Sequence, residues 1–333
     1  MDYFGTDINS CRNRVFGKEE RTYLMGIAIF MIILLHFYCW FNGTRPWWIY
    51  FFSEGQTGVD IFLFLSAYGL EASIRKNGWK RFYCNRAKRI LPVYFLFLFT
   101  LFVFFQNHVP IKHITIQIIC QLSGFSLFQR PDFFSTGFEF DWFTPALILI
   151  YISFPVISFW LNRLLKYSQY ADIIILIICI IISLLDFRFI HLPIKFLLYR
   201  LPIIIIGAIT YIYIEKGKTN RLLTLYIILF FAGIFSNQHS FLTSSSVPIA
   251  MTVYAITQGH RPFQRTISLL GRHSYEIYLA HIFPVTNFLM IKPFENIYTF
   301  IFVTISWTIL VATIYVIFQK YSNSAINSIS IKK

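Results

Sequence analysis

Long apolar runs recur along almost the whole chain, and they constrain its fold more than any other feature. Hydrophobic residues make up 56% of the 333 positions and charged residues 13%, and the mean hydropathy is +0.61. Soluble globular chains carry about 25% charged residues, so this composition excludes a water-soluble fold. The sequence therefore predicts an all-α, polytopic membrane protein.

A transmembrane helix needs roughly 20 mostly apolar residues, and the chain offers ten candidate segments. They cover residues 22–41, 57–74, 90–107, 140–160, 171–186, 193–214, 222–238, 243–258, 274–291 and 297–318. The stretch 112–128 is interrupted by polar residues such as Gln117 and Gln121, which favours an interfacial or partly buried segment. We therefore predict a bundle of about ten transmembrane helices.

Positive charges are distributed unevenly between the two sets of loops. With a cytoplasmic N-terminus, 22 of the 29 Lys and Arg residues fall in inside loops and six in outside loops, as the positive-inside rule requires. This asymmetry explains the net charge of +14 and removes the reason to expect a nucleic-acid partner. The expected organisation is a cytoplasmic segment 1–21, a membrane domain 22–318 in the plasma (inner) membrane, and a cytoplasmic tail 319–333.

Neither the cysteines nor the N-terminus suggests export or metal binding. The five cysteines are scattered without CxxC or Cys/His spacing, so we expect neither a disulfide framework nor a metal site. The first twenty residues are polar, so no cleavable signal sequence is expected before the first apolar segment.

Two ionisable side chains lie near the outer ends of the first two predicted spans. His36 would be about 9 Å and Asp60 about 6 Å below those ends, at 1.5 Å per helical residue. An imidazole whose tautomer is fixed by a carboxylate is the usual arrangement of a general base. The alternatives are a structural histidine bonded to a neighbouring helix and an aspartate that caps the second helix.

Further polar candidates lie at both faces. Arg86 and Arg89 are spaced i,i+3 on one helix face, a geometry suited to a phosphate or pyrophosphate; topology and anionic lipid are the other explanation. Arg200 lies inside a predicted span and needs an anionic partner or a water-filled cavity. Trp142 is either an aromatic-belt anchor or a platform for substrate.

Several segments together resemble the acyltransferase 3 family of membrane O-acyltransferases. Residues 24–37 end in the sequence Leu-His-Phe, and residues 58–68 read GVDIFLFLSAY. Residues 86–92 read RAKRILP, Trp142 opens a segment that closes at Phe154-Pro155, and residues 270–281 read LGRHSYEIYLAH. Each motif is weak alone, but their order and spacing over residues 21–284 are specific.

The resemblance implies a ten-helix bundle that transfers an acyl group, usually acetyl, from cytoplasmic acyl-CoA to a hydroxyl, most often on a cell-surface or lipid-linked carbohydrate. His36 would be the base and Asp60 its partner, while Arg86, Arg89 and Arg200 would serve the acyl-CoA donor. Trp142 would lie beside the acceptor. Ser66 and Tyr275 would line the tunnel between the two faces or simply pack.

Two departures from the family keep other functions open. Met25 stands where the family frequently has arginine, and Leu147 where it frequently has glutamate. Arg21, one helical turn before Met25, would reach the same region. A transporter or flippase of a lipid-linked sugar and an inactive member of a polysaccharide-assembly complex remain the alternatives.

Overall fold

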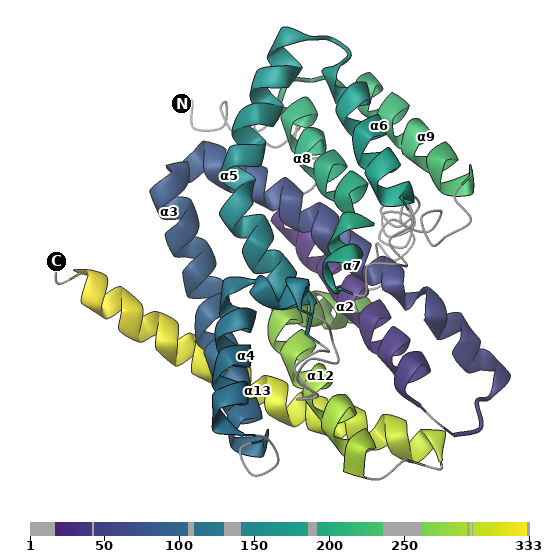
Figure 1. The fold of residues 1–333 in the computed structure, drawn as a ribbon, viewed down its shortest axis with the longest axis vertical. Coiled ribbons are helices and arrows are strands. Elements are labelled where there is room, and N and C mark those ends of the chain that lie inside the picture. Colours follow the sequence, from purple (N-terminus) through teal and green to yellow (C-terminus); the bar gives the residue numbers. More distant parts are fainter. Residues whose placement is uncertain are drawn as a thin grey trace, which may run out of the picture.

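In the computed structural model, every regular element of the described residues is a helix. These residues are 17–41, 43–105, 110–129, 141–185, 192–235, 261–291, 294 and 296–331. In chain order the helices are α2 (Lys18–Trp40), η1 (Trp47–Gln56), α3 (Thr57–Phe105), α4 (Ile111–Ser123), η2 (Phe125–Phe128), α5 (Phe143–Tyr167), α6 (Ala171–Leu184), α7 (Ile194–Leu198), α8 (Leu201–Glu215), α9 (Thr219–Phe235), α11 (Arg261–Arg272), α12 (Ser274–Ile291) and α13 (Ile297–Ile331). The prediction of an all-α fold is confirmed for this part of the chain (Figure 1).

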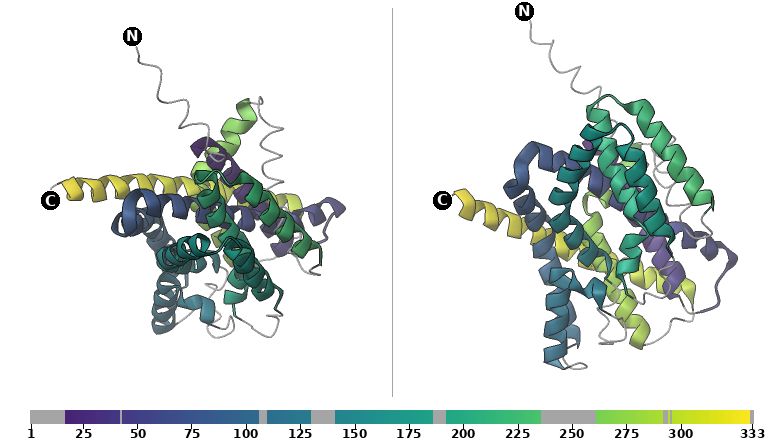
Figure 2. Two further views of the ribbon diagram at one scale, coloured as in Figure 1. Left: turned by 90° about the horizontal axis from the view of Figure 1, so that it is seen from above. Right: turned by 45° about the horizontal axis from the view of Figure 1, so that its top comes forward.

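Three of these helices, α2, α5 and α13, are long and apolar enough to cross a bilayer. The apolar helices α6, α8 and α9 are shorter, and the expected span at 243–258 lies outside the described residues. The protein is therefore a membrane protein, while the count of ten spans stays a prediction. The tail predicted from residue 319 is helical as far as Ile331, because α13 continues through it and projects beyond the other helices (Figure 2).

The predicted second and third spans lie in two helices that meet at the non-helical residue Gly78 and together carry the label α3. Gly78 has φ 68° and ψ 173°, an extended conformation with positive φ that glycine adopts without the steric cost of a Cβ. Residues 79–89, between the predicted second and third spans, are helical on the far side of this bend. Arg86 and Arg89 thus lie on one helix, as their i,i+3 spacing predicted.

Two other predicted segments are short or interrupted. Residues 112–128 form the 13-residue helix α4 followed by η2, and 13 helical residues extend only about 20 Å, too little to cross the hydrocarbon core. The predicted span 193–214 is divided into α7 and α8. Arg200 is the N-cap of α8 and Pro202 lies in its first turn, where proline needs no N–H partner.

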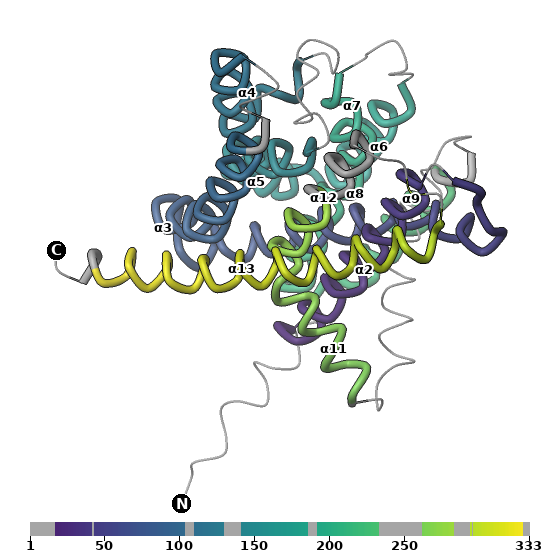
Figure 3. Tube along the Cα trace, turned by 90° about the horizontal axis from the view of Figure 1, so that it is seen from below, coloured from purple at the N-terminus to yellow at the C-terminus, as the bar shows by residue number. Residues whose placement is uncertain are grey.

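Helix α2 lies at the centre of the bundle and packs against α3, α11 and α12. Glycines allow the closest of these contacts. A Cβ at Gly271 of α11 would lie 1.7 Å from the carbonyl oxygen of Thr22, and one at Gly26 of α2 would lie 1.9 Å from that of Ile267. The two backbones can approach this closely only because both positions lack a side chain; Figure 3 shows α11 beside the beginning of α2.

A buried carboxylate ties the first half of α3 to α5 and α8 just before the bend. Glu71 is fully buried and accepts hydrogen bonds from Arg75 Nε at 2.8 Å and Asn162 Nδ2 at 2.9 Å. Arg75 also bonds to Asn162 and to Glu215 at the end of α8. Because a buried charge is tolerated only when it is paired, this network holds the end of the first half of α3 in one place.

Candidate functional site

A cavity of about 120 Å³ lies between α2, both halves of α3, α5 and α12. We call it the arginine cavity because Arg21, Arg86 and Arg89 all line it. Its other lining residues are Met25, Phe62, Leu65, Ser66, Gly69, Ile90, Phe143, Leu147, Tyr151, Ser274, Tyr275 and Tyr278. No carboxylate is among these described residues, so the cavity favours an anion.

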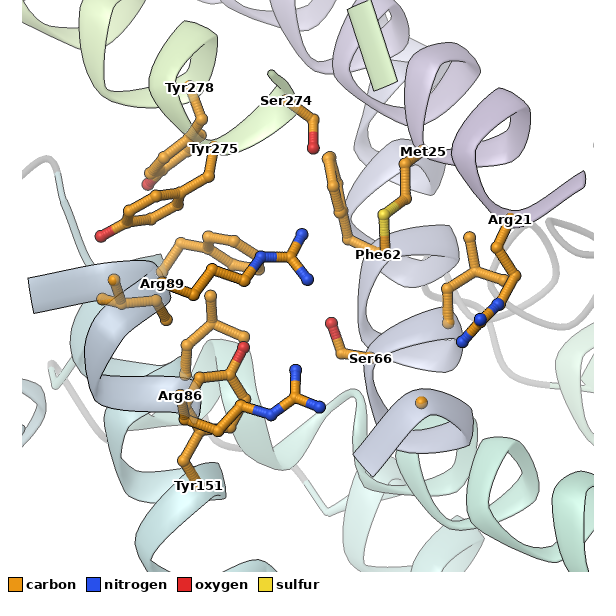
Figure 4. A pocket seen from close by; sticks show the side chains of 15 residues that line it. Arg21, Met25, Phe62, Ser66, Arg86, Arg89, Tyr151, Ser274, Tyr275 and Tyr278 are labelled. Carbon is orange, nitrogen blue, oxygen red and sulfur yellow. The ribbon is translucent and has the colours of Figure 1, made fainter. Parts of the chain in front are cut away.

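Arg86 and Arg89 extend from the second half of α3 toward the side of the cavity where Ser66 lies (Figure 4). The Nε atom of Arg86 is buried and has no hydrogen-bond partner among the described residues. Burial, together with the positive charges of Arg89 and Arg21 and against the influence of Tyr151, lowers the pKa of the Arg86 guanidinium. An anion between these groups would relieve the repulsion and satisfy the buried donor.

Both departures from the family pattern lie on this same cavity. Met25 and Leu147 line it from α2 and α5, and Arg21 lines it one helical turn before Met25. The guanidinium carbon of Arg21 lies 5.9 Å from the ring centre of Tyr68. An arginine therefore lines the cavity together with Met25, but it is residue 21, one helical turn earlier in α2.

The volume of the cavity limits what it can hold. Sites for drug-sized ligands are typically 300–1,000 Å³, so about 120 Å³ suits a phosphate or diphosphate group rather than a whole nucleotide. The hydroxyls of Ser66 and Ser274 face the same space as the guanidinium groups of Arg86 and Arg89 (Figure 4). Guanidinium and hydroxyl donors together match the oxygens of such a group.

A second group of predicted residues gathers around Arg200. Its Nε lies 3.0 Å from Asp60 Oδ1, and only 13% of the Arg200 side chain and 2% of that of Asp60 are exposed. The guanidinium carbon of Arg200 lies 5.5 Å from the ring centre of Trp142, within reach of a cation–π interaction. The anionic partner that Arg200 required is therefore Asp60.

Asp141 fixes the start of α5 and with it the place of Trp142. Its Oδ1 accepts hydrogen bonds from the Thr144 N–H at 3.1 Å and from the Tyr278 hydroxyl at 2.9 Å. A carboxylate at a helix N-terminus pairs with unsatisfied N–H groups and with the positive end of the helix dipole. Tyr278 also lines the arginine cavity, so Asp141 links the Arg200 group to that cavity.

His36 lies in a third place, against α12. Its Nδ1 is 2.7 Å from Nε2 of His281, and its ring stacks on Trp40 with 4.0 Å between ring centres and 8° between ring planes. His281 is 1% exposed, and its Nδ1 lies 3.0 Å from the carbonyl oxygen of Ile277. We call His36 and His281 the histidine pair.

The predicted residues thus form three groups. Ser66, Arg86, Arg89 and Tyr275 share the arginine cavity, Asp60, Arg200 and Trp142 form the second group, and His36 belongs to the histidine pair. A contact between Asp60 and the imidazole of His36 stays a prediction. His281 was not among the residues predicted to form the site, although a histidine inside a predicted span is a functional candidate by the rule that selected His36.

Comparison with known proteins identifies the family. The model of the family described as "Acyltransferase domain" matches residues 22–318. No curated protein and no solved structure matches the chain. Since the family model covers most of the chain, including all three groups of residues, the protein belongs to this family of acyltransferases.

Proposed function

We propose that the protein is an integral-membrane O-acyltransferase. It would move an acyl group, in the first instance acetyl, from cytoplasmic acyl-CoA to a hydroxyl of a cell-surface or lipid-linked carbohydrate. The observation that carries this proposal is the cavity with three arginines and no described carboxylate in a chain that belongs to an acyltransferase family. A ten-helix bundle in the plasma (inner) membrane with both termini in the cytoplasm would hold this site.

The donor would be held by its phosphates in the arginine cavity. Arg86 and Arg89 would form bidentate hydrogen bonds with the pyrophosphate of CoA, and Arg21 would add a third charge from α2. His36 lies eleven residues beyond Met25 on α2, or about 16 Å along the helix axis. The pantetheine arm would cover that distance, passing Ser66 and Tyr275.

The acceptor hydroxyl would react at His36. General-base removal of its proton as the oxygen attacks the thioester carbonyl makes a poor nucleophile effective without a covalent acyl-enzyme. The Asp60–Arg200 ion pair lies beside Trp142, where charge and an aromatic face suit a sugar. Trp47 and Trp48 at the start of η1 would border the entry from the outer face.

Binding of a non-hydrolysable acetyl-CoA analogue to the purified full-length protein tests the donor site. A charge-assisted hydrogen bond contributes about 1.5–3 kcal/mol, so Arg89→Gln should raise the Kd about 10- to 150-fold. Arg89→Lys should rescue binding only in part, because an ammonium group does not offer the bidentate fork of donors.

Arg81→Gln is the matched control, because Arg81 is exposed on the same helix and does not line the cavity. It removes an equal charge and should leave the Kd unchanged. If a purely topological role explained the arginines, Arg81→Gln and Arg89→Gln would behave alike and Arg89→Lys would be fully functional.

The division of the predicted sixth span into α7 and α8 favours a second candidate function. Discontinuous helices with a charged residue at the break are typical of substrate sites in transporters, and Arg200 is the N-cap residue of α8. A transporter or flippase of a lipid-linked sugar would not need acyl-CoA. Failure of the folded wild-type protein to bind the analogue would favour this function, or an inactive role in a polysaccharide-assembly complex, over acyl transfer.

A further inference from the structure

We propose that His281 is a positioning residue that fixes the tautomer of His36 and makes Nε2 of His36 the basic atom of the site. This inference rests on the proposed function, in which His36 is the general base. Two short contacts support it: one joins His36 to His281, and the other joins His281 to the backbone of α12.

The contact between His281 and the backbone of α12 determines which atom donates in each of the two hydrogen bonds. A carbonyl oxygen only accepts hydrogen bonds, so Nδ1 of His281, 3.0 Å from the Ile277 oxygen, must carry the proton. The Nε2 of a neutral His281 then has a lone pair. A doubly protonated ring would place a full positive charge on a side chain that is 1% exposed, at a high cost in free energy.

The lone pair on Nε2 of His281 determines which tautomer His36 adopts. Because Nε2 of His281 is an acceptor, the 2.7 Å contact requires that Nδ1 of His36 carries a proton and donates it. A neutral imidazole has one protonated nitrogen, so Nε2 of His36 is left with its lone pair. Stacking on Trp40 holds the ring plane, and the histidine pair therefore presents one basic nitrogen in one orientation.

In the proposed reaction this nitrogen first accepts a proton and later returns it. Nε2 of His36 takes the proton of the acceptor hydroxyl while the hydroxyl oxygen bonds to the thioester carbonyl carbon. The C–S bond then breaks, and the departing thiolate receives the proton from Nε2, which gives an ester and free CoA. In between, the imidazolium of His36 donates from Nδ1 to Nε2 of His281, and this charge-assisted bond stabilises the positive charge.

The tautomer can be measured without any turnover. We would label the full-length protein with 15N-histidine and record its imidazole nitrogen resonances at about pH 8, above the ordinary histidine pKa, with His36→Gln to assign the signals. We expect a protonated Nδ1 and an unprotonated Nε2 for His36. The opposite tautomer in the folded protein would overturn the inference, whether or not the protein transfers acyl groups.

Two variants of His281 test its effect on catalysis. His281→Gln keeps an oxygen acceptor near the place of Nε2, and His281→Phe keeps a ring without an acceptor. We expect His281→Phe to lower kcat about 10²–10⁴-fold, the usual contribution of a positioned base, with the KM for acyl-CoA nearly unchanged. His281→Gln should restore much of kcat.

Binding of the acetyl-CoA analogue to both variants shows that they are folded. Equal activity in His281→Phe and wild type would overturn the positioning role, and so would equal loss in both variants with binding intact. If the wild type has the expected tautomer but transfers no acyl group from any CoA ester tested, the proposed function fails and the tautomer assignment stands.

Discussion

The arginine cavity and the histidine pair differ in how the chain builds them. Two arginines of the cavity are i,i+3 neighbours on one helix, and the third comes from α2. The histidine pair joins residues 245 positions apart, through a 2.7 Å contact between α2 and α12. The attraction of the arginines for an anion extends over several ångströms, whereas the histidine pair depends on two hydrogen bonds. Small displacements of the helices should therefore disturb the histidine pair more than anion binding in the arginine cavity.

The largest effect that separates the two regions should come from His36→Ala. Acyl transfer should fall about 10²–10⁴-fold, while binding of the acetyl-CoA analogue to the arginine cavity stays unchanged. Steady-state transfer assays and analogue titration measure the two separately. His113→Ala, at an exposed position of α4, is the control; full activity in His36→Ala would leave His36 a structural histidine.

Gly271→Ala should disturb both regions at once, because α2 carries Arg21 to the cavity and His36 to the pair. The new Cβ would lie 1.7 Å from the Thr22 carbonyl oxygen, and overpacking of this kind costs about 1–3 kcal/mol. Thermal unfolding in detergent should show a lower Tm.

Gly69→Ala is the matched control for that substitution. Its Cβ would lie 3.5 Å from Arg21 Nη1, an ordinary contact, and alanine stabilises a helix interior by roughly 0.5–1 kcal/mol relative to glycine. The two substitutions should therefore shift the Tm in opposite directions. A lower Tm in both would mean that the close approach of α2 and α11 is not the cause.

Arg21 and Met25 allow a smaller change confined to the cavity. Arg21→Gln should weaken analogue binding about tenfold, the effect of roughly 1.4 kcal/mol, and the double variant Arg21→Gln/Met25→Arg should recover it. Calorimetric titration of both variants measures this. Unchanged binding in Arg21→Gln would show that two arginines suffice and that Arg21 does not replace the family arginine.

The mildest substitutions test whether the cavity faces the cytoplasm. Single cysteines in place of Asn85 and Thr115, both exposed, should leave activity unchanged in a cysteine-free background. A membrane-impermeant thiol reagent should label Asn85→Cys only from the cytoplasm and Thr115→Cys only from outside. Labelling of both from one side would contradict the proposed topology.

The sequence alone was sufficient for the features that depend on local chemistry. Hydropathy predicted an all-α membrane protein. Polar residues within 112–128 predicted an interfacial or partly buried segment rather than a full span, and this stretch forms the short helices α4 and η2. The spacing of Arg86 and Arg89 predicted their common helix face, because helical periodicity follows from sequence position. Motif order identified the family, which the match over residues 22–318 confirms.

Only the tertiary structure decided which distant residues meet. Asp60 pairs with Arg200, His36 contacts His281, and Met25, Leu147 and Arg21 share one cavity. Hydropathy gives the length of a helix but neither its rotation nor its neighbours, which packing decides through contacts such as that between Gly26 and Ile267. The bend at Gly78, where φ is 68°, was likewise not predicted, because the relative direction of the two helices that meet there depends on their packing against the rest of the bundle.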